Sequence, residues 1–295
     1  MTRYLITGAG GQLGADLLRV LSTRDAVPDD EAVGLARAQL DISDVAAVHD
    51  ALAELKPDVV INAAAYTAVD AAETDEAGAT LGNVTGPRNL AAATSKTGAR
   101  LVHVSTDYVF AGDADNPYDE DSPTDPRSVY GRTKRDGELA VLEQQPDAYV
   151  VRTAWVYGAD GANFVKTMAR LERQRDVVSV VNDQRGSPTW SHDLARGLVA
   201  IGASSAEPGI YHCTNAGETT WFGFTQAIFE ELGADPSRVS PTTTEAFPRP
   251  APRPPYSVLG NRRWRAANLP AMPHWRDALR AAFATSAEAF RGSAS

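Results

Sequence analysis

The sequence predicts an α/β fold of the doubly wound (Rossmann) class, a parallel sheet with helices on both faces, followed by a smaller and irregular substrate-binding part. One observation is that short apolar runs alternate with helical patterns along the first half of the chain. Such uninterrupted apolar strands are typical of parallel sheets buried on both faces. Another is a glycine-rich loop directly after the first apolar run. The length of 295 residues is enough for one large domain or two modest ones.

In the first half, each expected strand is a short apolar run, and the runs lie at residues 4–6, 32–35, 59–61, 101–104 and 149–151. The helix after the second run is expected to be N-capped by Ser43, because Val45, Val48 and Leu52 follow with the spacing of one helix face. The other helices are expected at residues 13–21, 83–95 and 130–142. Helices therefore separate the strands, as a doubly wound sheet requires.

The second half is less regular. Strands are expected at residues 177–181 and 210–213, and helices at 194–201, at 220–232 and from Trp275 onward. The segment 247–255 contains five prolines, which exclude a regular helix or an inner strand. We therefore expect a dinucleotide-binding part over residues 1–155, joined by 176–203, and a substrate-binding part formed by residues 156–175 and 204–295.

Charge and cysteine content exclude several classes of protein. Lys and Arg number 28 and Asp and Glu 38, so the net charge is −10, which argues against a nucleic-acid-binding protein and a polybasic membrane anchor. An anionic ligand is not excluded, because a small site can be locally basic. The single cysteine, Cys213, excludes a disulfide framework and a cysteine-ligated zinc site. Lacking a secretion signal or a long apolar stretch, the chain is expected to be cytoplasmic, and a homodimer stays open.

The glycine-rich loop follows the first strand and opens the first helix, and its glycines Gly8, Gly11 and Gly14 are spaced three apart. Glycine at these positions permits a tight turn and a close approach of the backbone to a pyrophosphate, while the helix start offers free N–H donors. A glycine-rich turn without a ligand is the alternative. The loop lacks the Gly-Lys-Ser/Thr of a nucleoside-triphosphate site, which favours a dinucleotide.

The residue type at the end of the second strand discriminates between NAD and NADP. An acidic side chain there holds the ribose 2′-OH, whereas a basic one accepts a 2′-phosphate. The acidic residues 29–31 precede this strand, and Arg37 follows it. We therefore expect NADPH with Arg37 on the phosphate, and Asp41 and Ile42 beside the adenine. Two alternatives stay open: NADH as the cofactor, and Arg37 as a solvated loop charge.

A tyrosine and a lysine, Tyr130 and Lys134, lie four residues apart at the start of an expected helix, which brings both side chains to one face. A phenol has a pKa of about 10 and is a poor proton donor at neutral pH, whereas a nearby ammonium lowers that pKa. This pair suits the protonation of an oxygen atom while a hydride reaches its carbon. An exposed helix pair without a catalytic role is the alternative.

A hydroxyl-rich stretch, residues 105–110, follows the strand 101–104 at its carboxyl end, where doubly wound folds bind ligands. The hydroxyl of Thr106 is expected to bind a substrate carbonyl and hold it against Tyr130. The glycine loop, this stretch and the Tyr-x-x-x-Lys pair occur in one order along the chain, and the three together are far more specific than any of them alone.

These motifs, with residues 62–65 at the end of the third strand, resemble the extended short-chain dehydrogenases. More narrowly, the chain resembles the dTDP-4-dehydrorhamnose reductase family through residues 65–73, 152–157, 182–189 and 253–257. The resemblance covers nearly the whole chain. It implies reduction of the 4-keto group of dTDP-6-deoxy-L-lyxo-4-hexulose to dTDP-L-rhamnose, a step in the supply of sugars for cell-surface polysaccharide.

The resemblance also implies roles for individual residues. Tyr130 becomes the acid, Lys134 its tuning partner and Thr106 the carbonyl-binding hydroxyl. The pyrophosphate and adenine path is implied at Gly8, Gly11, Gln12, Leu13, Gly14, Ala63, Ala64 and Ala65. The sugar is implied to contact Thr67, Val69, Asp107, Tyr108 and Trp155, and Arg253 to bind the diphosphate, because a guanidinium suits bidentate phosphate contact.

Four further positions carry interpretations of their own. Arg185 departs from the aromatic or apolar residue that the family often has, which affects the shape of the local pocket. Some members bind Mg²⁺ at a dimer contact, and the matching positions here are Asp16 and Asp193. Asp is shorter than the usual Glu, so we do not expect a bound Mg²⁺ or another metal. Trp221 is expected to be a packing residue.

Related activities are weighed by single residues. Sugar-nucleotide 4,6-dehydratases share the Thr-Asp pair but carry Glu next, and the residue here is Tyr108, which disfavours elimination. An epimerase or another ketoreductase of the same superfamily stays open as an alternative. A non-catalytic NADP(H)-binding regulatory subunit is the alternative from another class, and the Thr106, Tyr130 and Lys134 set argues against it, because a pure binder needs no tuned phenol.

Overall fold

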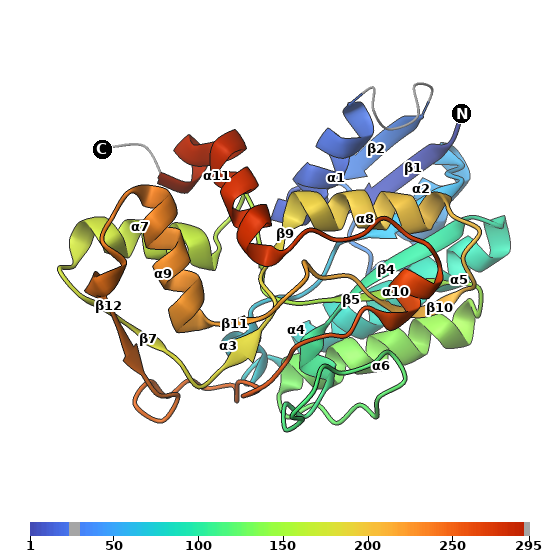
Figure 1. The fold of residues 1–295 in the computed structure, drawn as a ribbon. Coiled ribbons are helices and arrows are strands. Elements are labelled where there is room, and N and C mark those ends of the chain that lie inside the picture. The colour runs from blue at the N-terminus through green and yellow to red at the C-terminus, as the bar shows by residue number, and fades with distance from the viewer. Residues whose placement is uncertain (24–29, 292–295) are drawn as a thin grey trace.

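The computed structural model describes residues 1–23 and 30–291. A six-stranded parallel sheet lies at its centre in the strand order β10-β5-β4-β3-β1-β2. The strands are β1 (Arg3–Thr7), β2 (Glu31–Leu35), β3 (Val59–Asn62), β4 (Arg100–Thr106), β5 (Tyr149–Thr153) and β10 (Gly209–His212). The predicted fold class is confirmed, because helices cover both faces of this parallel sheet (Figure 1).

Alternate side chains of each strand enter two different cores. On β1, Tyr4 and Ile6 share a core with Leu17 of α1 (Gln12–Ser22) and Leu194 of α8 (Ser191–Ala203). Leu5 belongs to the core on the other face. The helices that contribute to that second core are α2 (Val45–Leu55), α5 (Gly86–Thr97) and α6 (Val129–Gln144). The strands are therefore buried on both sides, which explains their uninterrupted apolar sequences.

Two helix starts differ from the sequence-based expectation. The N-cap of α2 is Asp44 and not Ser43: the Asp44 carboxylate accepts hydrogen bonds from the backbone N–H groups of the first turn, whereas the Ser43 hydroxyl donates to Asp41. The helix expected from residue 83 begins earlier, because α4 (Glu76–Thr80) and a π-helical turn, η1 (Leu81–Thr85), run directly into α5. Neither cap residue nor π turn has a distinctive sequence pattern here.

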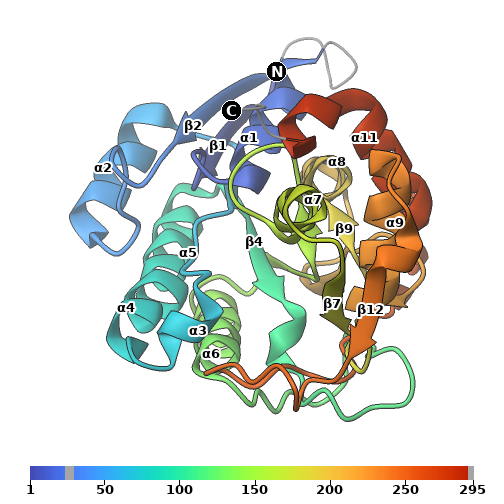
Figure 2. The ribbon, with the colours of Figure 1, turned by 90° about the vertical axis from the view of Figure 1, so that its left-hand side faces the viewer.

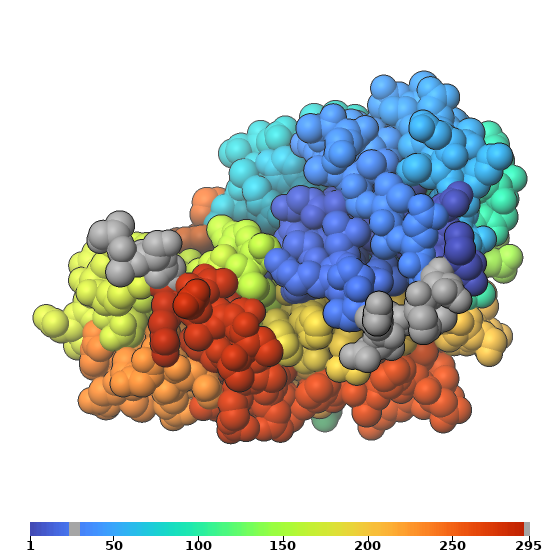
Figure 3. All heavy atoms as spheres, turned by 90° about the horizontal axis from the view of Figure 1, so that it is seen from above, coloured from blue at the N-terminus to red at the C-terminus, as the bar shows by residue number. Residues whose placement is uncertain are grey.

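A third core, separate from the two cores of the sheet, lies beside it. It is formed by α7 (Phe164–Gln174), α9 (Trp221–Leu232) and α11 (Trp275–Arg291) with the parallel pair β7 (Val178–Val181) and β12 (Val239–Thr242). Figures 1 and 2 show these elements gathered on one side of the molecule, and the space-filling view shows the orange and red segments on a different side from the blue and cyan ones (Figure 3). Neither α7 nor β12 was expected from the sequence.

The predicted division of the chain does not follow the sheets at two strands. Residues 209–212 were expected in the substrate-binding part, but β10 pairs with β5 as an edge strand of the main sheet. Residues 178–181 were expected with the cofactor part, but β7 pairs with β12 in the third core, beside the sheet. Helix α8 does pack on the main sheet. The two parts therefore exchange strands, and the division itself stays a prediction.

The remaining elements are short and connect these layers. They are α3 (Val69–Ala72), the 3-10 turns η2 (Asp107–Val109) and η3 (Pro236–Arg238), α10 (Arg262–Ala266), and the two-residue strands β6 (Val156–Tyr157), β8 (Arg185–Gly186), β9 (Thr189–Trp190) and β11 (Thr219–Thr220). As expected, the proline-rich segment 247–255 contains neither helix nor strand. Among the described residues, no helix is both long and apolar enough to cross a membrane.

Candidate active site

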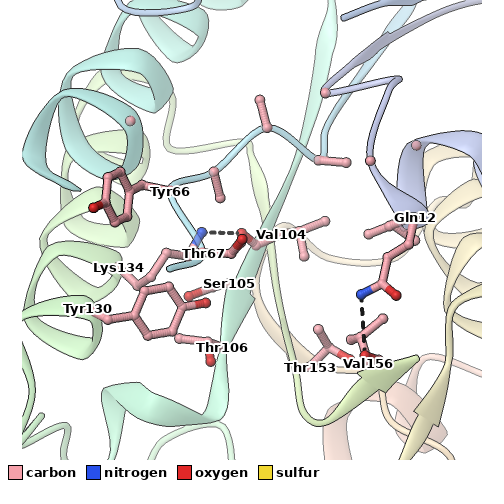
Figure 4. Close-up of a pocket in the computed structure, with 18 of the residues that line it drawn as sticks. Gln12, Tyr66, Thr67, Val104, Ser105, Thr106, Tyr130, Lys134, Thr153 and Val156 are labelled. Carbon is pink, nitrogen blue, oxygen red and sulfur yellow. Dashed lines mark hydrogen bonds between the residues drawn. The ribbon is translucent and has the colours of Figure 1, made fainter. Parts of the chain in front are cut away.

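A cavity of about 670 Å³ opens at the carboxyl ends of the central strands. Loops that follow β1, β2, β3, β4 and β5 meet there, together with the start of α6 (Figure 4). The cavity brings together nearly every residue singled out in the sequence: Gly8, Gly11, Gln12, Leu13, Gly14, Arg37, Asp41, Ile42, Ala63, Ala64, Ala65, Thr67, Val69, Thr106, Asp107, Tyr108, Tyr130, Lys134 and Trp155. Arg253 is the exception among the expected catalytic, cofactor-binding and substrate-binding residues, and Asp16, Asp193 and Arg185 also lie outside this cavity.

The glycine loop forms one end of the cavity and is packed too closely for side chains at two of its positions. Gly8 has a φ of +70°, and a Cβ atom there would lie 2.6 Å from the Ala64 nitrogen. A Cβ atom at Gly14 would lie 2.4 Å from the Gly8 oxygen. The loop therefore presents bare backbone to the cavity beside residues 63–65. Across the cavity, the Gln12 side chain donates to the Val156 carbonyl at 3.3 Å (Figure 4).

Arg37 lies at the outer edge of this end. Its side chain is 86% exposed and approaches Asp41 at 3.4 Å. The pKa of Asp41 is lowered, chiefly because the Ser43 hydroxyl and N–H donate to its carboxylate. Of the acidic residues 29–31, Asp30 precedes β2 and Glu31 is its first residue, and both lie at the opposite end of the sheet, since Asp30 accepts from the Thr2 N–H and Glu31 pairs with Arg3. Asp29 lies outside the described residues.

Tyr130 and Lys134 form the other end of the cavity, on the first turns of α6. Ser128 caps this helix by accepting from the Gly131 N–H at 3.1 Å. A Cβ atom at Gly131 would lie 2.2 Å from the Tyr108 oxygen, so glycine lets the helix start approach the end of β4 closely. Lys134 Nζ donates to the Val104 carbonyl at 2.7 Å (Figure 4). Both side chains therefore come from a helix that is fixed against β4.

Burial, rather than the lysine charge, controls the acidity of the phenol. It raises the pKa of Tyr130 to about 12, although a hydrogen bond with Thr106 works in the opposite direction. Burial also lowers the pKa of Lys134 to about 8. The expectation that the ammonium lowers the phenol pKa is therefore not met in this structure. A neutral phenol is nevertheless the protonation state that a proton donor needs.

The hydroxyl of Thr106 has a single proton and several neighbours. It lies 2.9 Å from Asp107 Oδ1, to which it donates, and it accepts from the Tyr108 N–H at 3.2 Å. Burial raises the pKa of the Asp107 carboxyl to about 6, and the hydroxyls of Ser257 and Thr106 only partly oppose this shift. An ionised Asp107 accepts the one hydrogen bond that the Thr106 hydroxyl can donate. When Asp107 is protonated, the Thr106 hydroxyl can donate to another acceptor instead.

Aromatic side chains form the wall between the two ends. Trp155 stacks on Trp221 with the ring centroids 3.5 Å apart and the planes 6° from parallel. Trp155 has a φ of +48°, a conformation that is uncommon for a bulky residue. A Cβ atom at Gly186 would lie 2.4 Å from the Trp155 ring, so this glycine makes room for the stack. Trp221 was expected only to pack, but it also lines the cavity.

Several cavity residues were not among the expected site residues, and three of them carry hydroxyl groups: Tyr66, Ser105 and Thr153. The first two lie next to residues that were singled out, so adjacency is the signal that could have found them. Thr153 ends β5, and its register opposite Thr106 of β4 is a property of the sheet pairing. No local sequence pattern predicts that register.

Arg253 lies outside the main cavity, in a smaller one of about 190 Å³. Tyr108 lines both cavities and is the link between them. Arg253 Nη1 pairs with Asp70 at 2.9 Å and donates to the Ala251 carbonyl at 2.8 Å. Arg185, the departure from the family pattern, lies beyond this cavity and pairs with Glu218 at 2.9 Å.

The two weak metal candidates are engaged with protein groups. Asp16 pairs with Arg19 at 2.7 Å and accepts from the Ser191 hydroxyl. Asp193 accepts from Asn215 at 2.9 Å. Within residues 1–23 and 30–291, no three His, Cys, Asp or Glu side chains gather as a metal site would require. We therefore assign no step of the chemistry to a metal.

Comparison with known proteins gives a consistent result. Residues 2–288 match the family model of the RmlD substrate binding domain. The chain is 54% identical over 286 residues to a dTDP-4-dehydrorhamnose reductase of Streptomyces griseus, covering 95% of this chain and 93% of the relative. It is 53% identical over 282 residues to a probable dTDP-4,6-dihydroxy-2-methyloxan-3-one 4-ketoreductase of Streptomyces antibioticus, covering 95% and 94% of the two chains.

A solved structure is similar over the same range. The dTDP-4-dehydrorhamnose reductase of Bacillus anthracis, in complex with NADP, is 38% identical and superposes with a TM-score of 0.90. The similarity covers 96% of this chain and 99% of the solved one.

Proposed function

This chain belongs to the RmlD substrate binding domain family, and we propose that it reduces the 4-keto group of dTDP-6-deoxy-L-lyxo-4-hexulose (dTDP-4-dehydrorhamnose) to give dTDP-L-rhamnose, using NADPH. One observation carries the proposal: the glycine loop and the set of Thr106, Tyr130 and Lys134 line the same cavity. A nucleotide cradle within reach of a proton donor is what hydride transfer to a carbonyl requires.

The residues at the glycine-loop end fit a dinucleotide. A Cβ atom at Gly8 or Gly14 would collide with backbone, so glycine allows the tight packing of this loop, and N–H groups at the start of α1 would donate to a pyrophosphate. Gln12 and Leu13 would line the pyrophosphate, residues 63–65 the path towards the adenine, and Asp41 and Ile42 its far end. Arg37 would meet the 2′-phosphate. When bound, NADPH supplies the hydride that reaches C4 of the sugar.

The protein supplies the proton and the orientation of the carbonyl. Tyr130 holds a proton at neutral pH and would donate it to the C4 oxygen as negative charge develops there. Thr106 would donate a second hydrogen bond to that oxygen, which requires that its proton be free of Asp107. Lys134, tied to Val104, would hold its ammonium below the cofactor ribose and Tyr130, and would favour the phenolate left after transfer.

The rest of the substrate would lie along the aromatic wall. Thr67, Val69 and Tyr108 line the cavity near Tyr130, and Trp155 closes it opposite. Flat aromatic faces suit the apolar faces of a 6-deoxysugar. Asp107 lies beside Thr106 at the polar end of the cavity. The diphosphate would lie towards Arg253 in the adjoining cavity, because a guanidinium binds phosphate oxygens. Tyr108 lines both cavities, so the adjoining cavity begins next to the catalytic end.

Two alternatives are weighed by particular observations. The 53% identity to a 4-ketoreductase of Streptomyces antibioticus favours, as second candidate, reduction of another dTDP-linked keto-deoxysugar. A non-catalytic NADP(H)-binding subunit shares the cradle but has no use for a buried Thr106, Tyr130 and Lys134 set. Elimination of water, as in 4,6-dehydratases, is disfavoured because Tyr108 takes the place of their glutamate.

The test is product analysis. The purified protein is mixed with NADPH or NADH and each keto-sugar nucleotide, and cofactor oxidation is followed at 340 nm while the product is identified by NMR. We expect dTDP-L-rhamnose, formed faster with NADPH. Tight NADPH binding without turnover of any keto-sugar would sink the reductase proposal. Faster turnover of a different dTDP-keto-deoxysugar would replace the substrate by the second candidate.

The cytoplasmic location and the division into two parts, both expected from the sequence, also stay proposals, and so does the homodimer, which the sequence left open. Light scattering after size exclusion measures the mass directly and decides between one copy and two. A mass near the 31.4 kDa of one chain would contradict the dimer.

A further inference from the structure

The proline-rich segment 247–255 passes close to α3, although the two are far apart in the sequence. Figure 2 shows the segment below α6 and near α3. Prolines restrict the backbone of the segment but leave it without strand or helix hydrogen bonds. Its position must therefore be fixed by other contacts.

Asp70 of α3 supplies three of those contacts. Its Oδ1 pairs with Arg253 at 2.9 Å and accepts from the Ala251 N–H at 3.2 Å, and its Oδ2 pairs with Arg249 at 2.9 Å. The Asp70 side chain is 26% exposed, so these pairs are partly shielded from water. A single carboxylate thus joins two arginines of the segment to the edge of the catalytic cavity.

The geometry at Arg253 leaves part of its guanidinium open. The contacts to Asp70 and Ala251 both use Nη1. Among the described residues, no hydrogen bond is made by its Nε or Nη2. The side chain is only 16% exposed and lines the small cavity next to Tyr108. A guanidinium fixed along one edge, with the other edge open to a cavity, is prepared for a bidentate oxyanion such as a phosphate.

Asp70 is also tied to the sugar side of the site through its own helix. It directly follows Val69, which lines the catalytic cavity, and lies three residues after Thr67, which does the same. A contact of Asp70 with the proline-rich segment therefore fixes the distance between the sugar wall and the open edge of Arg253. That distance must match the length from the sugar ring to its diphosphate.

We propose that Asp70 is a positioning residue for the nucleoside diphosphate part of the substrate, holding Arg253 with its open edge towards the small cavity and Arg249 beside it. This inference rests on the proposed function. The direction of the change in diphosphate affinity on loss of Asp70 distinguishes this role from its opposite. If Asp70 prepares Arg253, its loss weakens diphosphate binding; if Asp70 merely competes with phosphate for the guanidinium, its loss strengthens binding.

The experiment measures dTDP binding by calorimetry, because dTDP carries the diphosphate and needs no turnover. We expect Asp70→Asn to weaken dTDP binding about tenfold. Without the Asp70 carboxylate the Arg253 guanidinium is no longer held in place, and its ordering then costs free energy when dTDP binds. NADPH affinity should stay the same, and in turnover assays the loss should appear mainly in KM rather than kcat. Asp70→Glu should recover part of the affinity.

Asp183→Asn is the matched control. Asp183 anchors the same stretch of chain further upstream, through three contacts with Thr244 at 2.8–3.0 Å, but touches neither arginine. It should lower stability without the loss in dTDP affinity. A double-mutant cycle adds a second readout: in the Arg253→Ala background, Asp70→Asn should have little further effect on dTDP binding. If Asp70→Asn is poorly folded, Asp70→Ser and Arg249→Ala give the same comparison.

Unchanged or tighter dTDP binding in a folded Asp70→Asn protein overturns the inference, and so does an equal loss in Asp183→Asn. If either of these results is found while the wild-type protein still reduces the keto-sugar and binds dTDP, the inference fails but the proposed function stands. If the wild-type protein neither binds dTDP nor turns over a keto-sugar nucleotide, the proposed function fails together with it.

Discussion

The two ends of the cavity are built from different materials. The glycine-loop end is made of backbone: Gly8 and Gly14 leave no room for a Cβ atom, and the nearest charged side chain, Arg37, is mostly in solvent. The other end is made of buried side chains: Tyr130, Lys134 and Asp107, all with pKa values shifted by burial. The glycine-loop end therefore recognises the cofactor by shape, and the Tyr130 end controls the position of protons.

This difference teaches how each end responds to change. Adding atoms harms the backbone-built end, because its function depends on empty space. Removing polar atoms harms the side-chain-built end, because each buried polar group has a task or a partner. Substitutions at the two ends should therefore separate cofactor binding from proton transfer, and the following predictions test that separation, beginning with the largest expected effect.

Tyr130→Phe removes the proposed proton donor and nothing else of similar size. We expect turnover of the keto-sugar to fall by about 10²–10⁴-fold, the usual contribution of a positioned acid. NADPH affinity, measured by fluorescence titration, should change little, because the phenyl ring still packs against Tyr108. Near-normal turnover would show that the two ends do not divide the chemistry in this way.

Gly14→Ala adds one carbon at the backbone-built end. Its Cβ would lie 2.4 Å from the Gly8 oxygen and 2.6 Å from the Ala9 Cα, so backbone must move. We expect NADPH affinity to fall by at least about tenfold and stability by roughly 1–3 kcal/mol. Gly10→Ala is the control, because its Cβ would lie at an ordinary 3.5 Å from the Ala36 Cβ. Equal losses in the two variants would refute the steric account.

Asp107→Asn tests whether the buried carboxyl of Asp107 makes the stability of the protein depend on pH. The pKa of Asp107 is raised to about 6 in the folded state, so the stability it contributes is present below pH 3.8, its ordinary value, and is lost as pH rises through 6. Asn has no charge to bury. Between pH 4 and pH 8, urea unfolding should therefore show the variant gaining about 2–3 kcal/mol relative to the wild type. A difference that does not change with pH would contradict the assignment.

Arg37→Ala should give the smallest effect, because the side chain is 86% exposed and solvent screens its charge. We expect KM for NADPH to rise by a few fold to about tenfold, with KM for NADH unchanged. Steady-state kinetics with both cofactors provide the comparison. An equal change for the two cofactors would leave Arg37 as the solvated loop charge that the sequence also allowed.

Local patterns were sufficient for much of the site. The glycine spacing at Gly8, the Tyr130–Lys134 spacing and the position of Thr106 after an apolar strand all depend on residues close together in the chain. Parallel strands then bring their carboxyl ends to one edge. For this reason the cavity gathers these groups without any information about long-range contacts.

Contacts between distant residues were not predictable in the same way. The pairing of Asp70 with Arg253 joins segments more than 180 positions apart in the sequence and depends on the path of the proline-rich segment. The place of β10 beside β5 depends on a sheet register that the sequence of residues 209–212 does not encode. Trp221 entered the cavity because of its stack on Trp155, whose positive φ is also a tertiary effect.

Burial explains why the pKa of Tyr130 is raised, whereas the sequence predicted that the Lys134 ammonium would lower it. The spacing of Tyr130 and Lys134 correctly placed both in one cavity, but the sign of the phenol pKa shift depends on how deeply the pair is enclosed. Enclosure comes from the packing of β4 and α6 with the segments around them, and it is not visible in a four-residue spacing.

The most direct test of the account is the fate of the hydride in the complete reaction. NADPH carrying deuterium at C4 of its nicotinamide, prepared as each of the two stereoisomers, is incubated with the protein and dTDP-4-dehydrorhamnose, and the product is examined by NMR. The account predicts dTDP-L-rhamnose with one deuterium, bonded to C4 of the sugar and transferred from one of the two stereoisomers only. A product without deuterium at C4, or deuterium at another carbon, would contradict it.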